Sequence, residues 1–62
     1  MNKKLKAKIV EIFESQANFS QVIKADETII SRVIRGRREL SLDDQKKWAE
    51  VLDCNPEDIF LQ

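Results

Sequence analysis

The four arginines of this chain all lie within seven consecutive positions, as Arg32, Arg35, Arg37 and Arg38. A guanidinium group is a planar fork of donors that fits phosphate oxygens and also the two acceptors on the major-groove edge of guanine. Arginines also interact favourably with the C-terminal end of a helix dipole, but three of them within four residues exceed that need. The cluster therefore indicates a phosphate-binding surface, with Gly36 as the turn residue inside it.

Residue types that most enzyme chemistry requires are missing from the chain. The sequence has no histidine, no tyrosine and a single cysteine, Cys54. Metal ligation, nucleophilic triads and acid–base pairs near neutral pH all depend on sets of such residues. We therefore expect a protein that is not an enzyme and has no metal, cofactor or small-molecule substrate. A lone cysteine without an apolar leader or a bilayer-spanning run also predicts a cytoplasmic protein with no membrane partner.

The net charge of zero conceals a division of charge along the sequence. Residues 1–38 carry nine Lys and Arg against four Asp and Glu, whereas residues 39–62 carry two against seven. A one-sided basic surface is what binding to a nucleic acid requires, with the acidic part turned away from the phosphates. A solvated, charge-mixed surface on a helical bundle would explain the charges alone equally well.

Caps and apolar spacing predict five helices and no strands. The first helix is expected over residues 3–14, and each of the other four begins at a typical helix-capping residue. These starts are Ser15, Asp26, Ser41 with Asp44 three residues later, and Asn55 followed by Pro56. Gly36 supplies the left-handed residue that commonly ends a helix, here the third. Residues 2–4 are expected to fray as a basic arm.

Apolar residues recur at helical spacing and predict one buried face for each helix. The expected inward residues are Leu5, Ile9, Ile12 and Phe13; Phe19 and Ile23; Ile30, Val33 and Ile34; and Leu42, Trp48, Ala49 and Leu52. The apolar residues of the last helix either close the core or leave an apolar patch for a second copy, and we expect the second for part of them, namely Ile59, Phe60 and Leu61. A chain of 62 residues makes one domain, residues 1–62, and buries only about 60% of the surface of its unfolded form. The fold expected is an all-α, compact five-helix bundle that gains stability from self-association.

The expected third helix leaves polar side chains on its outer face. Arg32 can bond guanine, Thr28 can bond a base or touch a thymine methyl, and Glu27 can accept from cytosine. A short helix, a tight turn and a second helix is how a chain presents one helix to the major groove. A generic helical hairpin is the alternative, and the content of this outer face favours base reading.

Three segments together resemble a known family. Residues 15–20 read Ser-Gln-Ala-Asn-Phe-Ser, residues 30–38 read Ile-Ser-Arg-Val-Ile-Arg-Gly-Arg-Arg, and residues 40–52 continue in register. The chain resembles the lambda-repressor-like or Cro-type helix-turn-helix regulators of phages and prophages over nearly its whole length. Two positions depart from the family pattern, Lys24 where glycine is usual in the turn and Gln45 where an apolar residue is common.

The resemblance implies a transcriptional regulator, expected to be a repressor, that reads double-stranded DNA with the helix over residues 27–35. It assigns base reading to Glu27, Thr28 and Arg32. It assigns contacts with the DNA backbone to a second group, namely Gln16, Arg35, Arg37 and Arg38. An antitoxin-like or other helical protein-interaction module is the alternative function.

Three base-reading side chains specify too few base pairs to find one site in a genome, so we expect two copies of the chain. A homodimer, formed in solution or only on DNA, would bind a pseudo-palindromic operator with half-sites about 10 base pairs apart. The acidic second half holds more apolar residues than a small core is expected to absorb. The interface is therefore expected at Trp48, Ile59, Phe60 and Leu61.

Overall fold

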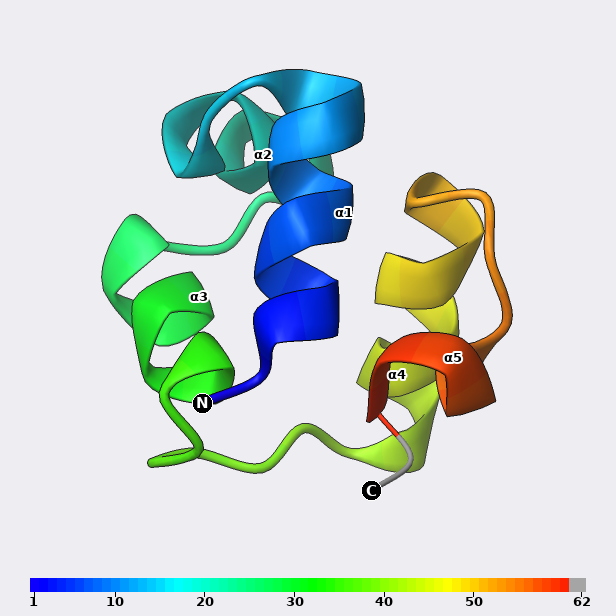
Figure 1. Cartoon of the computed structure of the whole chain (residues 1–62). Helices are drawn as coiled ribbons and strands as arrows, with labels where there is room; N and C mark the ends of the chain where they lie inside the picture. Colours follow the sequence, from blue (N-terminus) through cyan, green and yellow to red (C-terminus); the bar gives the residue numbers. More distant parts are fainter. Residues whose placement is uncertain (61–62) are drawn as a thin grey trace.

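Five helices follow one another within residues 1–60, which are the residues that the computed structural model describes (Figure 1). They are α1 (Lys3–Phe13), α2 (Gln16–Ile23), α3 (Glu27–Ile34), α4 (Leu42–Val51) and α5 (Pro56–Phe60). This part of the chain contains no strand, and its Cα radius of gyration is 10.1 Å. The expected all-helical, compact fold is thus confirmed. None of these helices is long and apolar enough to cross a membrane.

Polar side chains start three of the helices by accepting a backbone N–H. The Asn2 side chain accepts from Leu5 at 3.0 Å, Ser15 accepts from Asn18 at 3.2 Å, and Ser41 accepts from Asp44 at 3.2 Å. Each bond satisfies one of the amides that a helix leaves without an internal partner. Asp26 precedes α3 as expected, but its side chain makes no capping bond, so only half of that prediction holds.

Left-handed residues end α2, α3 and α4. Lys24 has φ of 58°, Gly36 has φ of 78°, and Asp53, which the sequence did not lead us to expect, has φ of 55°. After α4 the amide of Cys54 bonds to the carbonyl of Ala49 at 3.0 Å, which closes the helix end. The left-handed conformation expected at Gly36 is confirmed, and Lys24 adopts it as well, although it is not a glycine.

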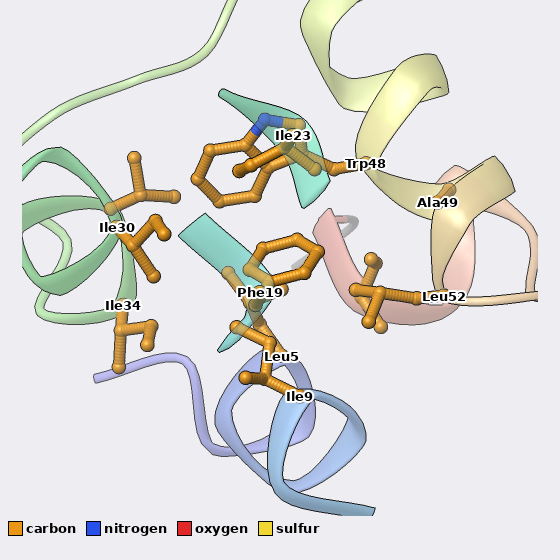
Figure 2. Packing of buried hydrophobic residues seen from close by; sticks show 11 residues of the cluster. Leu5, Ile9, Phe19, Ile23, Ile30, Ile34, Trp48, Ala49 and Leu52 are labelled. Atoms are coloured by element: carbon orange, nitrogen blue, oxygen red, sulfur yellow. The ribbon is translucent and has the colours of Figure 1, made fainter. Parts of the chain in front are cut away.

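The core lies where the buried faces of all five helices meet, and Phe19 of α2 is at its centre (Figure 2). Its ring centroid lies 5.3 Å from that of Phe13 and 5.3 Å from that of Trp48, the latter in an edge-to-face arrangement. Such aromatic pairs contribute about 0.5–1.5 kcal/mol beyond the area that they bury. The buried residues of the core are Leu5, Ile9, Phe19, Ile23, Ile30, Val33, Ile34, Trp48, Ala49, Leu52 and Ile59.

Two residues expected in the core lie outside it. Ile12 is 42% exposed because it stands at the flank of the α1 stripe, where Phe13 rather than Ile12 packs on α2. Leu42 is 74% exposed because it is the first residue of α4, beyond the part of the helix that its neighbours cover. Gln45 is half-buried, and its side-chain amide donates to the carbonyl of Leu40 at 3.1 Å.

Two residues expected at a dimer interface lie in the core instead. Trp48 is 3% exposed and Ile59 is 4% exposed, because α4 and α5 pack onto α1 and α2 and bury them within one chain. The expectation that they offer apolar surface to a second copy is therefore wrong. Phe60 is half-buried, and Leu61 lies outside the described residues.

Candidate nucleic-acid interface

The two faces of α3 differ in burial and in chemistry. Its apolar residues, from Ile30 to Ile34, pack into the core. Thr28, Arg32 and Arg35 are exposed, and their spacing of four and three residues places them in one row on the opposite face. Glu27 is exposed at the first position of the helix, to one side of this row. We call these four residues the α3 outer face.

The connection between α2 and α3 fixes the position of the α3 outer face. Lys24 reverses the chain in the left-handed conformation, and the amide of Ala25 bonds to the carbonyl of Ser20 at 3.2 Å. The helices α2 and α3 then pack directly against each other. Because Ile23 of α2 and Ile30 of α3 share the core, α3 is held as a rigid element with its polar side outward.

The turn after α3 keeps two more arginines beyond the helix end. The backbone amide of Gly36 donates to the carbonyl of Val33 at 3.1 Å, and the backbone amide of Arg37 donates to the carbonyl of Arg32 at 2.9 Å. These two bonds form a Schellman motif around the left-handed glycine. A Cβ added at Gly36 would meet nothing within 4 Å, so the backbone conformation rather than space calls for glycine. Arg37 and Arg38 are both exposed.

None of the arginines is neutralised within the described chain. Residues 1–60 form a single ion pair, between Lys8 and Glu11 at 3.7 Å, and it lies on α1. The guanidinium groups of the α3 outer face and of the turn are therefore free to bind an anionic partner. An exposed guanidinium that forms no ion pair is also the form in which arginine best bonds a phosphate or a base edge.

Gln16 lies at the first position of α2 and is half-buried. Ser15 satisfies the amide of Asn18 through its hydroxyl and that of Phe19 through its carbonyl. The amides of Gln16 and Ala17 have no partner among residues 1–60, as expected of the first residues of a helix. This helix start can therefore donate to an anion next to the Gln16 side chain.

One residue that the sequence analysis missed joins three helices. The backbone amide of Asn2 bonds to the carbonyl of Ile34 at the end of α3, and its side-chain amide donates to the carbonyl of Ile59 in α5. Its side-chain oxygen caps α1. The arm expected at residues 2–4 is thus wrong, because Asn2 is anchored and Lys3 already belongs to α1. Only the cap at Asn2 was readable from the sequence, since the other two bonds reach distant segments.

Other reactive groups lie away from this surface. Cys54 is half-buried after α4, and its pKa is raised mainly by burial and further by Asp58 and Asp53, against the lowering effect of Lys8. Its thiolate, the reactive form, is therefore disfavoured. Residues 1–60 also contain no group of three Cys, Asp or Glu residues that could hold a metal ion.

No protein-family model, curated protein or solved structure matches this chain. The α3 outer face, the arginine turn and the start of α2 are thus the basis for assigning a function.

Proposed function

We propose that this protein is a sequence-specific, double-stranded DNA-binding transcriptional regulator, a Cro-like repressor in which α2, the turn at residues 24–26 and α3 form a helix-turn-helix unit. The observation that carries this proposal is the α3 outer face. It is a row of free hydrogen-bonding side chains on a short helix whose other side is locked in the core. A B-DNA major groove, about 12 Å wide, admits such a helix.

The side chains divide into base-reading and backbone-binding groups. Arg32 offers two parallel donors to guanine, Thr28 bonds a base or packs on a thymine methyl, and Glu27 accepts from a cytosine amine. Arg35, at the end of the helix, and the exposed Arg37 and Arg38 bind the flanking phosphates and orient the domain. The side chain of Gln16 and the free backbone amides of residues 16 and 17 bind a phosphate on the other side of the groove.

A second class of function has one structural feature in its favour. Between α4 and α5 lies an apolar groove of about 260 Å³, lined in part by Leu42, Pro56 and Phe60. A protein-interaction module of the antitoxin type would bind another protein there. We favour its use by a second copy of this chain, since the base-reading face of one copy is small.

Selection of bound sequences from a random duplex pool tests the proposal. We expect an enriched pseudo-palindrome with half-sites about 10 base pairs apart, and binding to it that exceeds binding to a scrambled duplex at both low and high salt. Failure to enrich any sequence, together with capture of a distinct protein partner in a pull-down, would instead support the interaction module.

Replacement of Arg32 by alanine tests base reading directly. We expect Arg32→Ala to lose about 1–3 kcal/mol of binding free energy at the selected duplex and to relax preference at one base pair. Arg37→Ala is the matched control, because it removes the same charge from the turn and should weaken selected and scrambled duplexes equally. An equal loss on both duplexes for Arg32→Ala would remove it from the base-reading group.

A further inference from the structure

A hollow of about 940 Å³ opens beside the end of α3, between the first turn of α1, the α3–α4 connection and α5. Its lining includes the apolar residues Val33 and Ile59, and Lys3, Lys4 and Arg38 line it with positive charge. Within the described residues, Glu39 is the one carboxylate in this lining. Three cations against one anion make it a site that favours a negatively charged group.

The two lysines are positioned by the fold rather than by a mobile arm. Asn2 bonds to the carbonyl of Ile34 at the end of α3 and to that of Ile59 in α5, so the start of α1 is held against the end of the helix that carries the outer face. Figure 1 shows the first residues of the chain next to the last turn of α3 and the connection that follows it. Lys3 and Lys4 form the first turn of α1 and are exposed.

The charges in the hollow are also available. Neither lysine forms an ion pair within residues 1–60, and neither does Arg38. The hollow is continuous with the arginine turn, because Gly36 and Arg38 both line it. Lys3 and Lys4 therefore lie beside the turn whose Arg37 and Arg38 are proposed to bind the flanking phosphates.

We propose that this hollow is a binding site for a backbone phosphate diester of duplex DNA, held by Lys3, Lys4 and Arg38. The inference rests on the proposed function and extends it, because it adds a sequence-independent contact from α1 to the surface formed by α2 and α3. Lysine binds phosphate as a point charge without reading a base, so these contacts add affinity and salt dependence but no preference among sequences.

The test is the salt dependence of duplex binding by a Lys3→Gln/Lys4→Gln double variant. We expect the slope of log affinity against log salt to fall by about two units, equally for the selected and the scrambled duplex, while the preference between the two is kept. Lys6→Gln/Lys47→Gln is the matched control, since it removes two exposed lysines that line neither this hollow nor the α4–α5 groove, with the same change in net charge. It should leave the slope unchanged.

An unchanged slope in the Lys3/Lys4 variant, or the same fall in both lysine pairs, would overturn the phosphate site. Wild-type protein is titrated with the same duplexes, so failure of the phosphate site can be distinguished from failure of the proposed DNA-binding function. Wild-type binding with an unchanged variant slope overturns this inference alone, whereas a wild-type protein that binds no duplex overturns the proposed function and this inference with it. Circular dichroism of each variant establishes that the helices are retained.

Discussion

At the scale of single residues, two helix ends place a non-glycine residue in a backbone conformation that favours glycine. Lys24 and Asp53 adopt the left-handed conformation that Gly36 adopts without hindrance. For a residue with a Cβ this conformation costs about 1–2 kcal/mol. The chain tolerates it at Lys24 because the reversal there brings α3 back onto α2, which buries Ile23 and Ile30 together.

Lys24→Gly is therefore expected to stabilise the fold. Relief of the left-handed strain, less the conformational entropy that glycine loses on folding, leaves a gain of about 0.5–1 kcal/mol and a rise in Tm of a few degrees. Gly36→Ala is the opposite control and should lower Tm, because the open space around Gly36 does not relieve its backbone. Thermal unfolding measures both, and a lowered Tm in Lys24→Gly would contradict the strain assigned to this turn.

At the scale of the elements, α3 is held by neighbours at both of its ends. The reversal at Lys24 sets its start, and the bond from the amide of Asn2 to the carbonyl of Ile34 sets its end. The side chain of Asn2 carries this link on to α5 through Ile59. The helices α1, α3 and α5 are therefore linked by the hydrogen bonds of Asn2, whose polar groups would otherwise be unpaired where the helices meet.

Asn2→Asp separates the two roles of this side chain. The aspartate keeps an oxygen for the amide of Leu5 but loses the donor to Ile59, so we expect about 1–2 kcal/mol of lost stability in urea unfolding. Asn18→Asp is the control, because it removes a side-chain donor to Phe13 in an exposed position, where water replaces the bond. Equal stability of Asn2→Asp and wild-type protein would show that the link to α5 contributes nothing net.

At the scale of the whole molecule, the core leaves little apolar surface for a second copy. Trp48 and Ile59 are used within one chain, and Phe60 packs on Trp48 with ring centroids 6.3 Å apart. Leu42 remains the most exposed large apolar residue of α4, at the rim of the groove that Phe60 also lines. The dimer that we propose would therefore pair through the α4–α5 groove, and Leu42 rather than Trp48 is the residue to test.

Leu42→Asp is expected to leave half-site binding unchanged and to weaken cooperative binding to the full pseudo-palindrome by roughly tenfold, which corresponds to about 1.4 kcal/mol. The reason is that Leu42 supplies exposed apolar surface to the groove, and an aspartate there would remove that surface and add a carboxylate that must lose water when a second copy covers it. Val10→Asp controls for a new charge at an exposed apolar position of α1. Analytical ultracentrifugation with the full duplex counts the bound copies, and one copy at saturation in the wild-type protein would contradict the dimer.

Local features of this protein follow from the amino-acid sequence alone. Each helix start with Ser15, Ser41 or Pro56 depends on residues within one turn, and so does the left-handed end at Gly36. The polar outer face of α3 was also readable, because helical spacing alone decides which side chains lie opposite Ile30. Such features need no knowledge of the rest of the chain.

Which apolar faces are covered and which basic residues lie together depends instead on how the helices pack. Ile12 and Leu42 have the same helical spacing as buried residues, but burial depends on whether a neighbouring helix reaches them. Trp48 and Ile59 are buried for the same reason. Lys3 meets Arg38 across a hollow only because Asn2 ties α1 to α3 and α5. Contacts between segments so far apart are set by the packing of whole helices, which the spacing within one helix does not encode.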